Sequence, residues 1–198
     1  NFQKNNYDIN GNLKIVWEGL ASNLIHLKDF AKVLNNLKQK IPVEFHIITD
    51  RHEKGKIINN ISSSKKLKSM FHNFNKIIFH EWDDNTYSSI ITQCDFAIIP
   101  VNENSPTAKM KPENKLVNLW KMGMPVIASP IDSYKRVMNK SKIDCLCSSD
   151  SDWLKKFKQL SNSSKLRKSI ALQAKEFTKN NYSKDIVLNQ WDDIFNSV

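Results

Sequence analysis

Residues 95–100 read DFAIIP and residues 111–129 read KPENKLVNLWKMGMPVIAS, and these two stretches decide the fold class. The centre of the first stretch, FAII, is apolar throughout, which is typical of a parallel strand covered on both faces. In the second stretch, Pro112 suits the first turn of a helix and Gly123 suits its C-terminal cap. An apolar run that begins at Val126 follows at once. The two stretches therefore predict a strand, a crossover helix and a second parallel strand.

The same alternation of short apolar runs and helical patterns extends along the whole sequence. Helices with one apolar face are expected between the strands and after residue 150, ending with a C-terminal helix at residues 182–198. Such alternation is typical of a doubly wound α/β fold. We therefore predict a Rossmann-like, six-stranded parallel sheet with strand order 3-2-1-4-5-6 and a helical C-terminal tail. Its strands are expected at residues 13–17, 43–49, 76–79, 95–100, 126–128 and 143–147.

No internal repeat or interdomain linker interrupts this pattern, so residues 1–198 are interpreted as a single domain. Residues 1–12 are polar and asparagine-rich, and we expect them to form a frayed lead-in. A weaker helical region is expected between the second and third strands, interrupted by the polar run at residues 62–66 and including a surface loop. Ser129 is expected to cap the helix that follows it.

The composition is that of an ordinary globular domain, with 40% hydrophobic and 25% charged residues. No apolar stretch is long enough to cross a bilayer and none resembles a signal peptide, so a cytoplasmic location is expected. Cys94, Cys145 and Cys147 do not form a disulfide framework pattern, and we expect buried thiols. Metal binding by the C-x-C pair is disfavoured because no second ligand pair follows at zinc-site spacing.

The formal net charge of +10 raises the question of a nucleic-acid partner. The lysines are scattered along the chain, and no RNP-like motif, zinc-finger spacing or basic heptad helix is present. We therefore expect no nucleic-acid partner. A basic surface equally fits phosphate-bearing substrates or peripheral contact with an anionic membrane.

In an open parallel sheet, ligands bind where the strand order reverses, here between the first and fourth strands. The loops at that point are residues 18–23 and 101–111, and the second is longer than an ordinary connection. A helix N-terminus near Pro112 with Lys111 and Lys115 beside it can hold a phosphate. The residues leave two interpretations open, a diphosphate site or an ordinary helix start with two solvated lysines. Neither a G-x-G-x-x-G fingerprint nor a P-loop is present, which disfavours dehydrogenases and P-loop ATPases.

These stretches resemble the donor domain of GT-B glycosyltransferases of the group 1 type. In that family a strand ending in proline is followed by a loop, a helix and a G-x-P-V-I-A-S-like turn and strand, as in residues 95–100 and 111–129. The N-K-L of residues 114–116 is familiar among bacterial members. Residues 17–19 and 77–82 match earlier family segments, so the resemblance covers nearly the whole chain. It implies a nucleotide-sugar-binding half whose acceptor-binding partner, an N-terminal domain, lies outside this chain.

The resemblance also implies a set of donor-binding residues. Lys111, Asn114 and Lys115 would lie near the diphosphate, Glu81 and Trp82 would flank the nucleobase, and Asn118 would lie at the ribose. Among the histidines, only His26 is expected to contact a ligand. His46 is interpreted as structural, and His80 faces either the crevice or the core. The full set of expected donor-binding residues is Gly19, Asn23, His26, Glu81, Trp82, Lys109, Lys111, Glu113, Asn114, Lys115 and Asn118.

The implied activity is sugar transfer from a nucleoside-diphosphate sugar to an acceptor held by the second domain. No catalytic residue is assigned here, and neither a metal nor a further cofactor is expected. We expect the isolated domain to bind nucleotide without turnover. Many retaining members carry two glutamates eight positions apart, where this chain has Met110 and Asn118. That departure favours an alternative, a non-catalytic GT-B-like domain that acts in assembly. A flavodoxin-like or receiver-like domain is disfavoured, because Glu18 stands alone after the first strand.

Overall fold

The computed structural model describes residues 2–38, 42–51, 63–71 and 76–197. Its centre is a five-stranded sheet in the order β3-β2-β1-β4-β5, with every pair parallel. This order confirms the predicted reversal between the first and fourth strands. The strands are β1 (Leu13–Glu18), β2 (Val43–Thr49), β3 (Ile77–Glu81), β4 (Phe96–Ile99) and β5 (Val126–Ala128).

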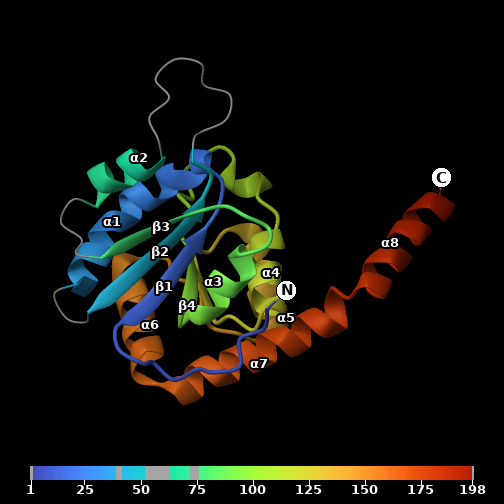
Figure 1. Ribbon diagram of the computed structural model, residues 1–198. Helices are drawn as coiled ribbons and strands as arrows, with labels where there is room; N and C mark the ends of the chain where they lie inside the picture. Colours follow the sequence, from blue (N-terminus) through green and yellow to red (C-terminus); the bar gives the residue numbers. More distant parts are fainter. Residues whose placement is uncertain (1, 39–41, 52–62, 72–75, 198) are drawn as a thin grey trace.

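Helices cover both faces of the sheet, as the apolar strand runs predicted (Figure 1). One face packs against α1 (Ile25–Lys38), α2 (Ser63–Met70) and α6 (Asp150–Asn162). The other packs against α3 (Tyr87–Gln93), α4 (Asn114–Lys121) and α5 (Asp132–Ser141). Two short 3-10 turns, η1 (Ala21–Leu24) and η2 (Ala108–Met110), lie in the loops after β1 and β4. Gly123 ends α4 with φ of 77°, and its amide donates to the Trp120 carbonyl, as its predicted capping role requires.

Residues 143–147 do not form the predicted sixth strand. They make one parallel bridge, between Ala128 and Leu146, with Ala128 bonded on both sides to the Cys145 carbonyl and the Cys147 amide. The chain leaves α5 through left-handed Lys142 and starts the capping box of α6 at Ser149. The single bridge is made at Ala128, the last residue of β5, so residues 143–147 add no ladder to the sheet.

Two smaller expectations are also wrong, and one is confirmed. Residues 63–66 of the polar run form the start of α2 instead of interrupting a helix, and residue 62 lies outside the described residues. The Ser129 hydroxyl accepts a hydrogen bond from the Val101 amide at 2.9 Å and does not cap α5. All three cysteines are buried free thiols, as expected.

The N-terminal segment is packed against the domain, contrary to the expected fraying. Buried Lys4 donates to the Cys94 carbonyl at 2.7 Å, and buried Tyr7 donates to the Gly123 carbonyl at 3.0 Å. Buried Arg167 of α7 (Ser164–Asn181) donates to the Tyr7 carbonyl at 2.9 Å and to the Leu160 carbonyl. These bonds hold residues 2–12 across the amino ends of the strands, away from the switch point.

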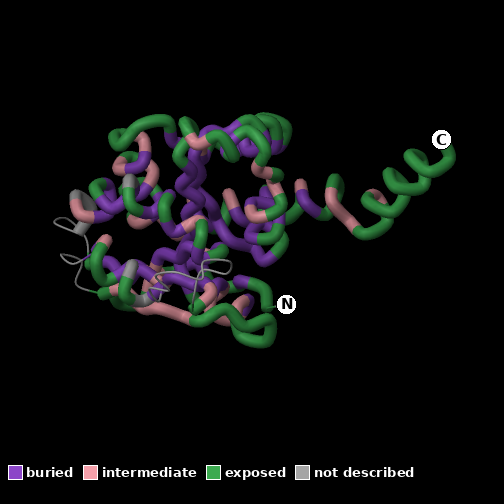
Figure 2. The backbone as a smooth tube through the Cα atoms, turned by 90° about the horizontal axis from the view of Figure 1, so that it is seen from above, coloured by how far each residue is buried: buried purple, intermediate pink, exposed green. Residues whose placement is uncertain are grey.

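The last helix, α8 (Lys184–Asn196), projects from the domain body (Figures 1 and 2). None of its residues is buried, and its apolar side chains Trp191 and Phe195 are 54% and 71% exposed. Serines cap both C-terminal helices, because Ser163 accepts from the Leu166 amide and Ser183 from the Ile186 amide.

No helix in the described part of the chain combines the length and apolar character needed to cross a membrane.

Candidate functional site

The carboxyl ends of β1, β2, β3 and β4 enclose two adjoining cavities at the predicted switch point. The larger, of about 370 Å³, is lined by Glu18, Gly19, Leu20, Asn23, Asp50, Trp82 and Lys115. The smaller, of about 200 Å³, is lined by Trp17, Asn23, His26, Ile99, Pro100, Val101, Lys111, Pro112, Asn114, Lys115 and Tyr134. Asn23 and Lys115 line both, so we call the two cavities together the switch-point cleft.

Lys115, in the first turn of α4, is the cation at the centre of this cleft. Its Nζ donates to the Glu18 carbonyl at 2.5 Å, lies 3.9 Å from the Glu18 carboxylate and sits 5.1 Å from the centre of the Trp17 ring. Its side chain is 23% exposed. Burial lowers the pKa of its ammonium below the ordinary value; Glu18 opposes this shift and Lys111 adds to it. The partly buried Lys115 ammonium therefore gains a favourable partner when an anion enters the cleft.

Lys111 supplies the second cation from the end of the β4–α4 loop. Its Nζ donates to the Asn23 side-chain oxygen at 3.0 Å, which joins the loops after β1 and β4. Burial lowers the pKa of the Lys111 ammonium as well. A second link joins the β4–α4 loop to the first turn of α1, because the Asn102 amide donates to His26 Nδ1 at 3.3 Å. His26 is 7% exposed and lies on the wall of the smaller cavity.

The N-terminus of α4 points its first backbone amides toward these lysines, since α4 begins at Asn114 in the wall of the smaller cavity. Glu113 caps the helix without a side-chain hydrogen bond to it. Its carboxylate instead accepts from Arg136 at 2.8 Å and from the Tyr182 hydroxyl at 3.1 Å. Glu113 therefore positions this helix start against α5 and the end of α7, and leaves the cleft side of the helix to cations and amides.

Trp82 forms the opposite end of the larger cavity, one residue beyond β3. Its ring is 38% exposed and packs against Tyr87 of α3 with ring centres 4.6 Å apart and an angle of 31° between the planes. The neighbouring Glu81 is the last residue of β3, and its carboxylate pairs with Arg51 at 2.9 Å. An indole supported from behind in this way presents a free aromatic surface on which a flat ring can stack.

The structure gathers part of the predicted set in the cleft and places the rest around it. Glu81, Lys109, Glu113 and Asn118 line neither cavity, and Lys109 and Asn118 are exposed. The predicted residues in the cleft walls are Gly19, Asn23, His26, Trp82, Lys111, Asn114 and Lys115.

The predicted donor-binding set omits several wall residues, among them Leu20, Asp50 and Tyr134. The sequence could have placed Asp50 in the cleft, because Asp50 is the first residue after a buried strand and the carboxyl ends of parallel strands share one edge of the sheet. The sequence carries no such signal for Tyr134, since it lies within α5 and only the packing of that helix brings it to the cleft.

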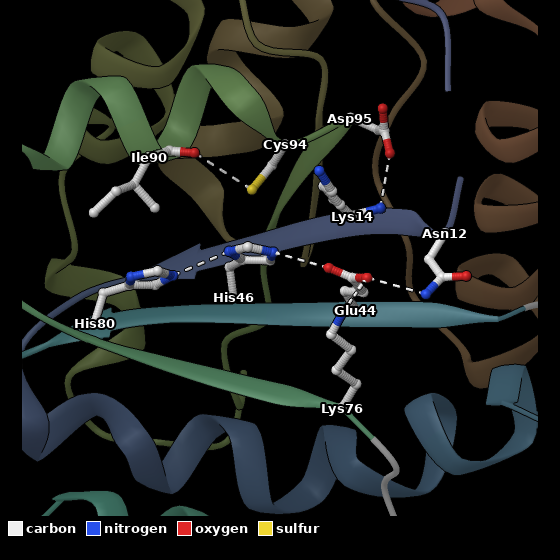
Figure 3. Close-up of polar contacts among 9 residues, drawn as sticks. All are labelled: Asn12, Lys14, Glu44, His46, Lys76, His80, Ile90, Cys94 and Asp95. Carbon is white, nitrogen blue, oxygen red and sulfur yellow. Dashed lines mark hydrogen bonds and ion pairs between the residues drawn. The ribbon is translucent and has the colours of Figure 1, made fainter. Parts of the chain in front are cut away.

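His46 and His80 lie outside the cleft, on the α3-covered face of the sheet (Figure 3). His46 Nδ1 is 3.0 Å from His80 Nε2, and His46 Nε2 faces the Glu44 carboxylate at 3.8 Å. Because that carboxylate favours a proton on His46 Nε2, Nδ1 is left to accept the hydrogen bond from His80. Burial lowers the pKa of His46 to about 4, and burial also lowers the pKa of His80. The interpretation of His46 as structural agrees with this pairing, and His80 faces the same interior cluster.

Comparison of structures identifies relatives of this fold. A glycosyltransferase from Rickettsia africae ESF-5 matches with a TM-score of 0.71 and 18% identity, over 96% of this chain and 48% of that protein. HepE of Anabaena, in complex with UDP-glucose, matches with a TM-score of 0.71 and 14% identity, over 95% of this chain and 50% of that protein. The C-terminal domain of the group 1 glycosyl transferase LpcC from Francisella tularensis matches with a TM-score of 0.63 and 16% identity, over 92% of this chain and 96% of that domain.

Sequence comparison adds no relative, because no protein-family model and no curated protein matches the chain. The chain spans about half the length of the Rickettsia and Anabaena proteins and nearly all of the isolated LpcC domain. The strand order and the flanking helices, with a match over 92% of the chain, give this chain the fold of the C-terminal domain of GT-B glycosyltransferases.

Proposed function

We propose that this domain binds a nucleoside-diphosphate sugar in the switch-point cleft and presents it for transfer to an acceptor held by a second domain. The observation that carries the proposal is the pair Lys111 and Lys115 at the N-terminus of α4, each held by a residue of the opposite loop. Two ammonium groups and free helix amides favour a diphosphate at this point. Trp82, at the far end of the larger cavity, offers the stacking surface for the nucleobase.

The chemistry follows from where negative charge develops. Breaking the bond between the sugar and the diphosphate leaves the diphosphate with additional negative charge. Lys111, Lys115 and the first amides of α4 stabilise that charge in a partly dehydrated cleft, where each interaction is stronger than in water. In this proposal, a group that activates the acceptor hydroxyl belongs to the second domain. The isolated chain is therefore expected to bind nucleotide without transferring sugar at an enzymatic rate.

A non-catalytic domain is the second candidate, and two residues favour it. Met110 and Asn118 occupy the positions of the paired glutamates in the resemblance, and Met110 is 81% exposed. In this second candidate the domain keeps the fold and serves assembly without binding a nucleotide. Binding of a nucleoside diphosphate is what separates the two candidates.

The test is thermal unfolding of the chain with UDP, GDP, ADP and CDP, each with and without magnesium. A ligand at a hundred times its dissociation constant stabilises the folded state by about 2.7 kcal/mol, which raises the melting temperature measurably. One diphosphate should give this shift, and Lys111→Ala and Lys115→Ala should each abolish most of it.

Lys121→Ala is the matched control, because Lys121 is an exposed lysine in the last turn of the same helix. This variant should retain the full shift. If no nucleotide shifts the wild-type melting temperature, the donor-binding proposal is wrong and the assembly role is favoured.

A further inference from the structure

The three strand ends at the larger cavity lie in a fixed order. Trp82 follows β3, Asp50 follows β2 and Gly19 follows β1, and the sheet order places β2 between the other two. The Trp82 amide donates to the Thr49 carbonyl at 3.0 Å, and the Gly19 amide donates to the Ile48 carbonyl at 3.1 Å. These bonds continue the strand pairing to the cavity wall. Along the cavity, an aromatic ring is therefore followed by a carboxylate and then by the lysine end.

Asp50 is fixed at this middle position from two sides. The hydroxyl of buried Ser63, the first residue of α2, donates to the Asp50 carbonyl at 2.6 Å. One carboxylate oxygen, Oδ2, accepts from the Ala21 amide at 3.3 Å. Among the described residues, the other oxygen has no hydrogen-bond partner. Asp50 thus presents unused acceptor capacity to the cavity that it lines.

The second carboxylate in the cavity is differently placed. Glu18 lies 3.9 Å from the Lys115 ammonium, so its charge is already paired within the cleft. The nearest cation in sequence to Asp50 is Arg51, whose guanidinium pairs with Glu81 at 2.9 Å. Asp50 is therefore the carboxylate of this cavity best suited to bind neutral hydroxyl groups.

A nucleoside diphosphate has its parts in the same order as the cavity wall, a base, a ribose and a diphosphate. The base matches Trp82 and the diphosphate matches the lysine end, which leaves the ribose opposite Asp50. The ribose presents vicinal 2′- and 3′-hydroxyls, both hydrogen-bond donors, and one carboxylate can accept from both. We propose that Asp50 is the ribose-binding residue of this domain and selects ribonucleotides over deoxyribonucleotides. This inference rests on the proposed binding of a nucleoside diphosphate in the cleft.

The resemblance implies a different ribose contact, Asn118, and the structure distinguishes the two. Asn118 is exposed and lines neither cavity, whereas Asp50 lies in the wall of the larger one. Mutation of Asp50 is therefore expected to weaken ribose binding, and mutation of Asn118 is expected to leave it unchanged.

The experiment measures dissociation constants by calorimetry for UDP, GDP, ADP and CDP and for their four 2′-deoxy counterparts. A hydrogen bond from a hydroxyl to a carboxylate predicts that the bound ribonucleotide is preferred about tenfold or more over its deoxy form. Asp50→Asn should reduce this preference to about twofold or less, chiefly by weakening ribonucleotide binding. Asp84→Asn is the matched control, because Asp84 is an exposed aspartate near Trp82 that lines neither cavity. It should keep the wild-type preference.

The possible outcomes test the assignment of Asp50 separately from the proposed binding of a donor. If the wild type binds a ribonucleotide and its deoxy form equally, the assignment of Asp50 is wrong while donor binding stands. If Asn118→Ala loses the preference and Asp50→Asn keeps it, Asn118 binds the ribose and the assignment is likewise wrong. If none of the eight nucleotides binds, the proposed function and this inference fail together. The wild-type preference needs no variant, so the inference stays testable even if Asp50→Asn does not fold.

Discussion

At the scale of single residues, Gly19 occupies a position where any side chain would crowd Lys115 and Trp17 in the switch-point cleft. A Cβ at this residue would lie 2.7 Å from Lys115 Nζ and 3.0 Å from the Trp17 ring. Trp17 is 1% exposed and cannot move aside, whereas the lysine ammonium ends a flexible chain. The absence of a side chain is thus what allows Lys115 to reach the Glu18 carbonyl.

We expect Gly19→Ala to displace the Lys115 ammonium and to weaken binding of the nucleoside diphosphate about tenfold, which corresponds to about 1.4 kcal/mol. The loss of folding stability should be about 1 kcal/mol, because the new methyl group also crowds Trp17. Calorimetric titration gives the affinity, and denaturant unfolding gives the stability.

Gly11→Ala is the matched control. Gly11 has φ of 87°, and a Cβ there would have no atom within 4 Å. The control should lose about 1 kcal/mol of stability through backbone strain and bind nucleotide as the wild type does. Equal affinities of the two glycine variants would contradict the role given to Gly19.

At the scale of secondary-structure elements, the sheet edge formed by β2 and β3 carries a series of polar side chains that bond to one another. Lys76 pairs with Glu44, which also accepts from the Asn12 side chain at 3.0 Å, and His46 and His80 continue the series toward the carboxyl end of β3 (Figure 3). His46 Nδ1 acts as an acceptor, so the His46–His80 bond requires that this nitrogen be unprotonated.

This arrangement predicts a loss of stability on mild acidification. The pKa of His46 is lowered by burial from an ordinary value of 6.5 to about 4, and that of His80 is also lowered. The unfolded chain therefore binds more protons than the folded chain between these values. The stabilising contribution is present above about pH 6.5 and is lost as the pH falls toward about 4. For His46 alone we expect a loss of about 1 to 2 kcal/mol between pH 7 and pH 5.

Urea unfolding at pH 7 and pH 5 measures this loss. His46→Gln removes the titrating ring and should make the difference between the two pH values smaller by about 1 to 2 kcal/mol. A variant with the same pH dependence as the wild type would show that other groups cause the loss.

At the scale of the whole molecule, the two ends of the chain make opposite contributions to the folded domain. The N-terminal segment is held by Arg167, whose guanidinium donates to the carbonyls of Tyr7 and Leu160. The C-terminal helix α8 extends from the body with every described residue at least partly exposed (Figure 2). Contact with the core, and not position in the sequence, therefore sets how much each end stabilises the fold.

Deletion of residues 183–198 should change the free energy of unfolding by less than about 0.5 kcal/mol, because none of the described residues that it removes is buried. Tyr182 stays in this variant because its hydroxyl donates to Glu113. Circular dichroism should report the lost helix while denaturant unfolding shows an unchanged midpoint.

Arg167→Met is the contrasting variant and should destabilise the domain by about 3 kcal/mol or more, since it leaves buried carbonyls without donors. A comparable loss from the α8 deletion would mean that α8 contributes to the folded core.

The amino-acid sequence by itself determined the order of strands and helices, because periodicity, Pro112 and Gly123 act locally. It also determined the switch point, since parallel topology follows from alternation along the chain. It predicted Lys111 and Lys115 beside a helix start, and α4 begins at Asn114, because helix-start signals are local in sequence.

Only the tertiary structure decided which side chains meet in the cleft. Asp50, Tyr134 and Lys115 are far apart in sequence, and their contacts depend on helix packing and strand register. The failed sixth strand has the same origin, because residues 143–147 are apolar enough for a strand, yet in the folded chain they meet β5 only at its last residue, Ala128. Local preferences are set by neighbours in the chain, whereas a binding site is set by neighbours in space.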